Sequence, residues 1–225
     1  MNTAQGNTGA PVFVPPTVSR LPLLVRPGLD LLIVGFNPSI PAWQAGHYYA
    51  NPRNEFYRLL FRHGLTDRLL TPDEDVLLPG LYGIGITDLV PRPSAGIGTI
   101  PAVEFQMAGE CRRKELIAAQ PSVLCCNGYG VFRYLTGCMR GPIDEHLPAS
   151  LCTIPVYAVP SSSGAACGLA HVRGEAWRRV ADAVAARRTP RAPCRYVGDS
   201  IEAADRRCGD AEFNALDVRG GPGTG

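Results

Sequence analysis

The stretch Leu-Leu-Ile-Val-Gly-Phe-Asn-Pro-Ser, at residues 31–39, decides the fold of this chain. Four apolar residues that end in glycine and proline predict a buried parallel strand leading into a sharp loop. Open α/β sheets bind ligands beyond the carboxyl ends of their strands, so Asn37 stands where a site is expected. A plain Asn-Pro turn with a local side-chain hydrogen bond is the alternative interpretation of this stretch taken alone.

Three more apolar runs alternate with segments of helical spacing. We expect strands at residues 81–89, 122–126 and 154–159. The expected helices are residues 54–63, 102–119, a segment beginning at 131–135, and 172–186. This alternation predicts an α/β fold of three layers, α/β/α, around a central, mainly parallel four-stranded sheet.

Composition divides the chain into three parts. Residues 1–20 are rich in Thr, Asn, Gly and Pro without periodicity, which predicts a flexible N-terminal arm. Residues 21–187 carry all the expected strands and helices and form one domain. Residues 188–225, dominated by Pro, Arg, Gly and Asp, form a C-terminal tail of uncertain order.

Charge and cysteine usage restrict the chemistry. The net charge of +2 does not by itself indicate nucleic acid binding, and Lys114 is the only lysine, so a Schiff-base mechanism would have a single candidate. The eight cysteines show no Cys-x-x-Cys spacing, which argues against a metal or cluster site. No leader and no long apolar segment is present, so we expect a cytoplasmic protein with reduced cysteines and no membrane association.

Polar residues follow each expected strand: Asn37, Asp88, Asn127 and residues 161–164. In a parallel sheet these positions meet at one edge, where they would form a pocket for an uncharged polar ligand. Asp88 is the only carboxylate among them and could orient a water molecule or stabilise a developing cation. The alternative for Asp88 is a cap or an ion pair with Arg92.

Two other segments suit a nucleic acid ligand. Residues 46–49, Gly-His-Tyr-Tyr, offer aromatic faces on which a flipped or single-stranded base could stack, although loop aromatics also fill cores. The serine turn at 161–163 precedes a helix and could bind a phosphate, or simply cap that helix.

At this point the residues resemble a family, the mismatch-specific uracil/thymine-DNA glycosylases of the uracil-DNA glycosylase superfamily. Residues 35–39 resemble its Gly-Ile-Asn-Pro-Gly motif, and residues 46–57 its Gly-Phe-x-Phe-Ala-His-Pro-x-Asn-x-Phe-Trp motif. Residues 85–93 are similar to Gly-Val-Thr-x-Leu-Val-x-Arg-Pro, and residues 160–163 to the Pro-Ser-Ser-Ser that opens the DNA-intercalating loop. The matches occur in order over residues 31–186, which makes them more specific than any single motif.

The resemblance implies a uracil-DNA-glycosylase-like fold and a monofunctional DNA glycosylase of base-excision repair. Such an enzyme flips uracil, mispaired with guanine or in a broader set of contexts, out of DNA and hydrolyses its N-glycosidic bond without a cofactor or metal. The implied partner is double-stranded DNA containing uracil or mismatched or damaged pyrimidines, with single-stranded DNA as a further candidate. The implied protein is a monomer in a bacterial-type cytoplasm, associated with the nucleoid.

The resemblance also assigns roles to residues. Asn37 would hold the attacking water through its amide oxygen, and Asp88 would activate that water or stabilise the cationic sugar. Tyr49 would stack on the flipped base. The expected substrate-binding residues are Gly35, Phe36, Ser39, Tyr49 and Asn127. The expected DNA-binding residues are Ser161, Ser162, Ser163, Gly164, Ala165 and Arg173.

Departures from the family pattern keep alternatives open. The position of Asp88 is not normally a carboxylate in the family, and Ala165 and Ala166 stand where a large DNA wedge is usual, which predicts weaker mismatch selection. One alternative is a protein that binds damaged or single-stranded DNA through the same pocket without catalysis. Another is a hydrolase triad of the serine turn, His171 and Asp88, although the chain lacks a Gly-x-Ser-x-Gly elbow.

Overall fold

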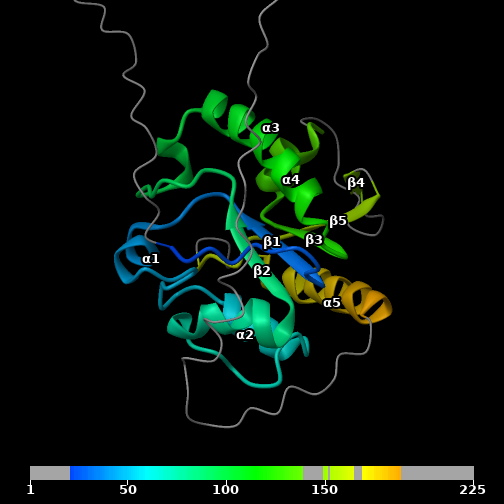
Figure 1. Cartoon of the computed structure of the whole chain (residues 1–225). Helices are drawn as coiled ribbons and strands as arrows, with labels where there is room; N and C mark the ends of the chain where they lie inside the picture. The colour runs from blue at the N-terminus through cyan, green and yellow to red at the C-terminus, as the bar shows by residue number, and fades with distance from the viewer. Residues whose placement is uncertain (1–20, 139–148, 152, 165–168, 189–225) are drawn as a thin grey trace, which may run out of the picture. The chain divides into compact units, whose positions relative to one another are not determined.

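A central β-sheet lies between layers of helices (Figure 1). The computed structural model describes residues 21–138, 149–151, 153–164 and 169–188. Within these ranges five strands form one sheet in the order β2-β1-β3-β5-β4. The strands are β1 (Leu31–Gly35), β2 (Ile84–Asp88), β3 (Val123–Asn127), β4 (Ala149–Leu151) and β5 (Ile154–Val159).

Strand direction and register bring the polar strand ends together. The four strands predicted from the sequence all run parallel, and only the short edge strand β4 is antiparallel. Gly35 pairs with Asp88 across β1 and β2, and Asn127 pairs with Val159 across β3 and β5. The loops that follow these parallel strands therefore leave the sheet at one edge, as the sequence predicts.

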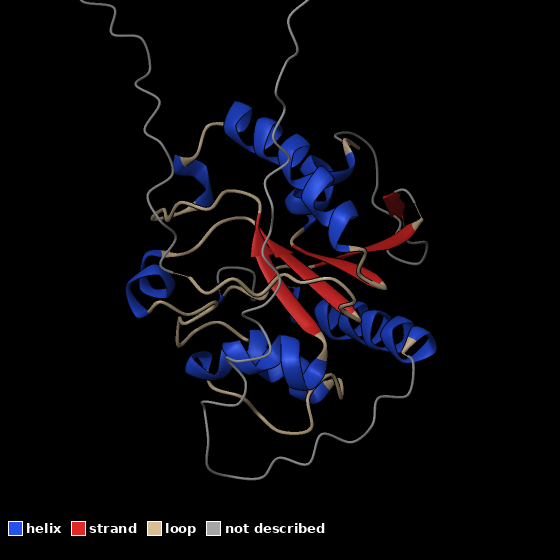
Figure 2. Cartoon of the chain, viewed as in Figure 1, coloured by secondary structure: helices blue, strands red, loops and turns tan. Residues whose placement is uncertain are grey.

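Helices cover both faces of the sheet (Figure 2). Alternate side chains of β1 supply the two cores: Leu31 and Ile33 face one layer of helices, and Leu32 and Val34 face the other. The first layer consists of α2 (Phe56–Arg62) and α5 (Ala170–Arg187), with the short α1 (Ile40–Ala45) beside it. The second layer consists of α3 (Ala102–Ala119) and α4 (Tyr129–Thr136). The predicted three-layer α/β/α fold is confirmed.

Short helical turns lie between α2 and β2 and between β2 and α3. These turns are η1 (Pro72–Leu77), η2 (Leu78–Tyr82) and η3 (Ile97–Thr99). The sequence interpretation missed them, as it missed α1 and β4, because each is too short to show a periodic pattern. No described helix is long and apolar enough to cross a membrane.

The predicted arm at residues 1–20 lies outside the described residues, and so does the predicted tail apart from its first residue. That residue, Arg188, binds Asp30 at 3.0 Å and donates a 2.7 Å hydrogen bond to the carbonyl of Tyr82. Among the described cysteines, Cys125 and Cys126 are buried in β3, whereas Cys111 and Cys138 are exposed.

Candidate active site

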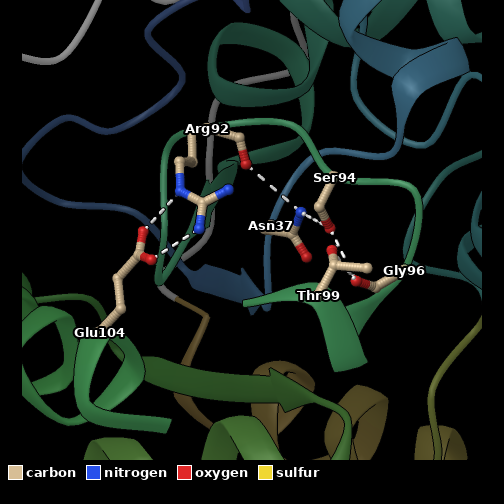
Figure 3. Close-up of polar contacts among 6 residues, drawn as sticks. All are labelled: Asn37, Arg92, Ser94, Gly96, Thr99 and Glu104. Atoms are coloured by element: carbon tan, nitrogen blue, oxygen red, sulfur yellow. Dashed lines mark hydrogen bonds and ion pairs between the residues drawn. The ribbon is translucent and has the colours of Figure 1, made fainter. Parts of the chain in front are cut away.

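Asn37 lies in the loop after β1 and is half-buried. Its amide nitrogen points toward Ser94 and the backbone carbonyl of Arg92 (Figure 3). The Nδ2 group donates to Oγ of Ser94 at 2.8 Å and lies 3.0 Å from the carbonyl of Pro38 and 3.3 Å from the carbonyl of Arg92. Its Oδ1 accepts no hydrogen bond from any residue that the structure describes. Asn37 therefore presents an acceptor, rather than a donor, to whatever enters beside it.

Asp88 is the last residue of β2 and is 7% exposed. Its carboxyl group packs over Gly35: a side chain at that glycine would clash with Oδ1 of Asp88. Burial raises the pKa of Asp88 from 3.8 to about 7, and the positive charge of Arg112 opposes this rise. Both protonation states are consequently accessible near neutral pH, which suits a group that handles protons.

Arg92 does not bind Asp88, so the ion-pair alternative for Asp88 is wrong. The Arg92 guanidinium makes two hydrogen bonds, of 2.7 and 2.6 Å, to the carboxylate of Glu104 in the first turn of α3 (Figure 3). This fork fixes the loop after β2, whose backbone carbonyl at Arg92 meets the Asn37 amide.

Tyr49 places its hydroxyl beside the same glycine, 3.1 Å from where a Gly35 side chain would begin. One face of its ring stacks on Phe56, with a centroid distance of 3.9 Å. The hydroxyl is buried and makes no geometrically sound hydrogen bond within the described part of the chain. Burial and the charge of Asp88 raise the Tyr49 pKa, and an interaction with the Asn127 side chain opposes this rise, so the hydroxyl stays protonated.

Asp75 of η1 holds the segment that carries Tyr49 in place. The sequence analysis did not single out Asp75. The fully buried Asp75 carboxylate lies 3.1 Å from Nδ1 of His47 and accepts a 2.9 Å hydrogen bond from the backbone N–H of Tyr48. The Tyr57 hydroxyl binds the Tyr48 carbonyl at 2.8 Å. Tyr49 then adopts a φ of 56°, a left-handed conformation that is strained for a residue with a side chain. In the sequence Asp75 is one of three consecutive acidic residues at 73–75, and nothing local distinguishes it from the other two.

Asn127 and Ser162 bind each other at the ends of β3 and β5. The Asn127 amide donates to the Ser162 hydroxyl at 2.8 Å and accepts from the Ser162 N–H at 2.9 Å. Ser162 is completely buried and its side chain anchors the serine turn through Asn127, while the predicted binding of DNA by this turn stays a prediction. The Ser162 carbonyl also accepts a 3.0 Å hydrogen bond from Glu55, which joins this turn to the 46–57 motif.

The rest of the serine turn lies nearer the surface. Ser161 accepts a 3.2 Å hydrogen bond from the N–H of Ser163, and Gly164 lies so close to the backbone of Arg53 that a side chain there would touch it. Gly164 is exposed, and Ser161 and Ser163 are partly exposed. Ala165, predicted to contact DNA, lies outside the described residues, as does Ala166.

Arg173 of α5 was also predicted to bind DNA, and the structure corrects this. Its side chain is 2% exposed and forms an ion pair with Glu55, 118 residues earlier in the chain. A guanidinium so deeply buried cannot reach a phosphate of the DNA backbone. Arg173 instead supports the 46–57 segment against α5.

Phe36 and Ser39 flank Asn37, and contacts with neighbouring residues fix the position of each side chain. The Phe36 ring meets Phe105 edge-on at 5.3 Å and lies against Gly130, where any side chain would overlap it. Ser39 caps α1 by accepting a 3.3 Å hydrogen bond from the N–H of Ala42. Both positions border the Asn37 loop, and their predicted contact with a base stays a prediction.

The hydrolase triad is not assembled. His171 is exposed on the first turn of α5, and no hydrogen bond among the described residues joins it to Asp88 or to the serine turn. What the fold does bring together is Gly35, Asn37, Tyr49 and Asp88, at the carboxyl edge of β1 and β2.

This chain is similar to a solved structure and to a protein-family model. A solution NMR structure of a protein from Methanosarcina acetivorans, provisionally described as a uracil DNA glycosylase, is 23% identical in sequence and superposes with a TM-score of 0.49. The match covers 73% of this chain and 96% of that one. A family model described as the uracil DNA glycosylase superfamily matches residues 22–181, from the segment before β1 into α5. The chain belongs to the uracil-DNA glycosylase superfamily.

Proposed function

We propose that this chain is a monofunctional DNA glycosylase that flips uracil, mispaired with guanine or in a broader set of contexts, out of DNA and hydrolyses its N-glycosidic bond. Superfamily membership suggests uracil-DNA glycosylase activity. The observation that carries the proposal is that the ends of two neighbouring strands carry Asn37, whose amide oxygen accepts no hydrogen bond from the described residues, and Asp88, whose carboxyl group is buried.

The reaction needs a positioned water molecule and a favourable electrostatic environment. The bond between the sugar C1′ and the uracil N1 breaks, its electron pair leaves with uracil, and positive charge develops on the sugar. Water oxygen forms a new bond to C1′, a water proton departs to Asp88 or to solvent, and the uracil anion takes up a proton from solvent. The products are free uracil and an abasic deoxyribose. Positioning and charge stabilisation supply most of the acceleration in such a reaction.

Asn37 and Asp88 divide these tasks. An amide cannot take a proton from water, so Asn37 acts by accepting a hydrogen bond from the water and fixing its direction. The ionised form of Asp88 can accept the proton or stabilise the cationic sugar, and its low exposure strengthens either effect. A pKa of about 7 leaves a useful fraction of Asp88 ionised at physiological pH.

The substrate base would lie at the edge of the sheet where β1 and β2 end, next to Asn37, Tyr49 and Asp88. We assign Gly35, Phe36, Ser39 and Asn127 to its surroundings, with the free face of the Tyr49 ring stacked on the base. One feature supports this placement: the Tyr49 hydroxyl, which lies near Gly35, has no hydrogen-bond partner of sound geometry among the described residues.

The DNA backbone would meet the serine turn, through Ser161, Ser163 and Gly164, with Ala165 following in the same loop. This assignment is supported by the full or partial exposure of Ser161, Ser163 and Gly164 at the edge of the sheet that carries the site. Backbone N–H groups and hydroxyls of such turns are common phosphate ligands. Because Ala165 is small, we expect weak discrimination against bases opposite the lesion.

A glycosylase assay tests the proposal. Labelled oligonucleotides with U:G, U:A, T:G or single-stranded uracil are incubated with the protein in EDTA and then treated with alkali, which cleaves the strand at abasic sites. We expect cleavage at U:G. Because the small Ala165 should discriminate only weakly against the base opposite uracil, we also expect activity on the other uracil contexts. Absence of cleavage together with tight binding of uracil-containing DNA would support the non-catalytic DNA-binding alternative.

A further inference from the structure

We infer that Ser94 is a positioning residue that holds the Asn37 amide in one of its two orientations, so that Oδ1 rather than the NH₂ group meets the attacking water. The inference rests on the proposed function and concerns the same site. Ser94 lies in the loop after β2, 57 residues from Asn37, and its Oγ makes the shortest contact of the Asn37 amide, at 2.8 Å (Figure 3).

The neighbours of Asn37 allow only one orientation of the amide. The carbonyl oxygens of Pro38 and Arg92, 3.0 and 3.3 Å away, can accept hydrogen bonds but cannot donate them. Turning the amide over would place Oδ1 against both oxygens, with repulsion in place of attraction. The orientation therefore follows from the chemistry of the surrounding groups.

Ser94 is the third hydrogen-bond acceptor around the Asn37 amide, because its own hydroxyl proton is already used in another hydrogen bond. The Ser94 hydroxyl donates to the carbonyl of Gly96 at 3.0 Å, which leaves a lone pair of Oγ directed at the Asn37 amide. A chain of hydrogen bonds therefore runs from Asn37 through Ser94 to Gly96, and each bond in such a chain polarises the next. The same loop is fixed at its other end by the fork between Arg92 and Glu104 (Figure 3).

The orientation matters for catalysis because water attacks through a lone pair. An amide oxygen that accepts a proton of the water leaves the lone pair free to point at C1′. An amide NH₂ in the same place would instead donate to that lone pair and compete with the bond that has to form. Loss of the Ser94 contact should consequently slow the chemical step and leave DNA binding unchanged.

Three variants test the inference. Ser94→Ala should lower the single-turnover rate on U:G DNA roughly three- to tenfold, the equivalent of one neutral hydrogen bond. Ser94→Thr keeps the hydroxyl at a half-exposed position and should restore the rate. Thr99→Ala is the matched control, because the Thr99 hydroxyl binds the same Gly96 carbonyl, at 2.7 Å, without contacting Asn37 (Figure 3). We expect Thr99→Ala to keep the wild-type rate.

Binding is measured separately with an oligonucleotide that contains 2′-fluoro-2′-deoxyuridine, whose glycosidic bond resists cleavage. Its dissociation constant should be the same for wild-type protein and Ser94→Ala. In an Asn37→Ala background, Ser94→Ala should cause no further loss, because its effect passes through the amide. Thermal unfolding of each variant shows how much of any loss reflects the fold.

The outcomes separate the two claims. An active wild-type protein with an unimpaired Ser94→Ala variant, an equal loss in Thr99→Ala, or an undiminished effect of Ser94→Ala in the Asn37→Ala background would each overturn the positioning role alone. A wild-type protein that releases no uracil would overturn the proposed function, and the role of Ser94 with it.

Discussion

Replacing Asp88 with asparagine should slow base excision and at the same time stabilise the folded protein at pH 8. Asparagine has nearly the shape of aspartate but carries no charge. The carboxyl group of Asp88 accepts no hydrogen bond from the described residues, so the substitution removes no protein contact of that kind. The two effects then have opposite signs, which a substitution that merely damaged the fold would not produce.

The size of the stability change follows from the pKa. Burial raises the pKa of Asp88 from 3.8 to about 7. Between these two values the unfolded chain has released a proton that the folded chain still holds, so rising pH favours unfolding. Each pH unit is worth about 1.4 kcal/mol, so the full penalty above pH 7 is about 4 kcal/mol, as an upper limit.

Urea unfolding of both proteins at several pH values between 4 and 8 measures this penalty. We expect similar unfolding free energies near pH 4, a difference in favour of Asp88→Asn that grows toward pH 7, and a constant difference above it. Single-turnover excision provides the second readout. The wild-type rate should rise with pH and level off near pH 7, whereas the variant should be roughly 100-fold slower without that rise.

Each readout can refute the reasoning by itself. Equal stability of the two proteins at pH 8 would show that Asp88 does not carry a buried charge there. An excision rate for Asp88→Asn close to that of the wild type would remove Asp88 from the catalytic mechanism.

Three further substitutions test other parts of the site. Gly35→Ala should displace the Asp88 carboxyl group, cost roughly 1–3 kcal/mol in urea unfolding and suppress excision; unchanged excision would contradict the site placed beside Asp88. Asp75→Ala should release the segment that carries Tyr49, cost roughly 1–3 kcal/mol and weaken binding of 2′-fluorouridine DNA, and wild-type affinity would count against this. Arg173→Met should lower the thermal midpoint but leave the slope of log affinity against log salt unchanged, because the buried guanidinium meets no phosphate; a shallower slope would restore Arg173 as a DNA contact.

The sequence predicted the fold because each parallel strand is an apolar run with a clear end. Glycine and proline stop β1, and β3 ends at Asn127 before a glycine, so both boundaries could be read locally. The parallel arrangement then placed Asn37 and Asp88 at one edge without further information. The short elements α1 and β4 offered no period to detect, and Pro41 obscured the first of them.

The sequence could not predict contacts between distant segments. Arg173 looked like a surface cation because its partner, Glu55, lies 118 residues away and only the folded chain brings them together. Ser162 looked exposed in a polar turn, and its burial depends on the amide of Asn127. Ser94 follows the third motif, residues 85–93, and was not singled out from the sequence, although its hydroxyl accepts a hydrogen bond from Asn37.

The most direct test of the account is to quantify free uracil released from a U:G duplex in a single turnover, for the wild-type protein and for Asn37→Ala. The account predicts close to one uracil per duplex from the wild type, an equal number of abasic sites, and a rate at least 100-fold lower for Asn37→Ala, roughly the scale of loss when a group that positions or stabilises the transition state is removed. Equal rates for the two proteins, or no uracil from the wild type, would contradict it.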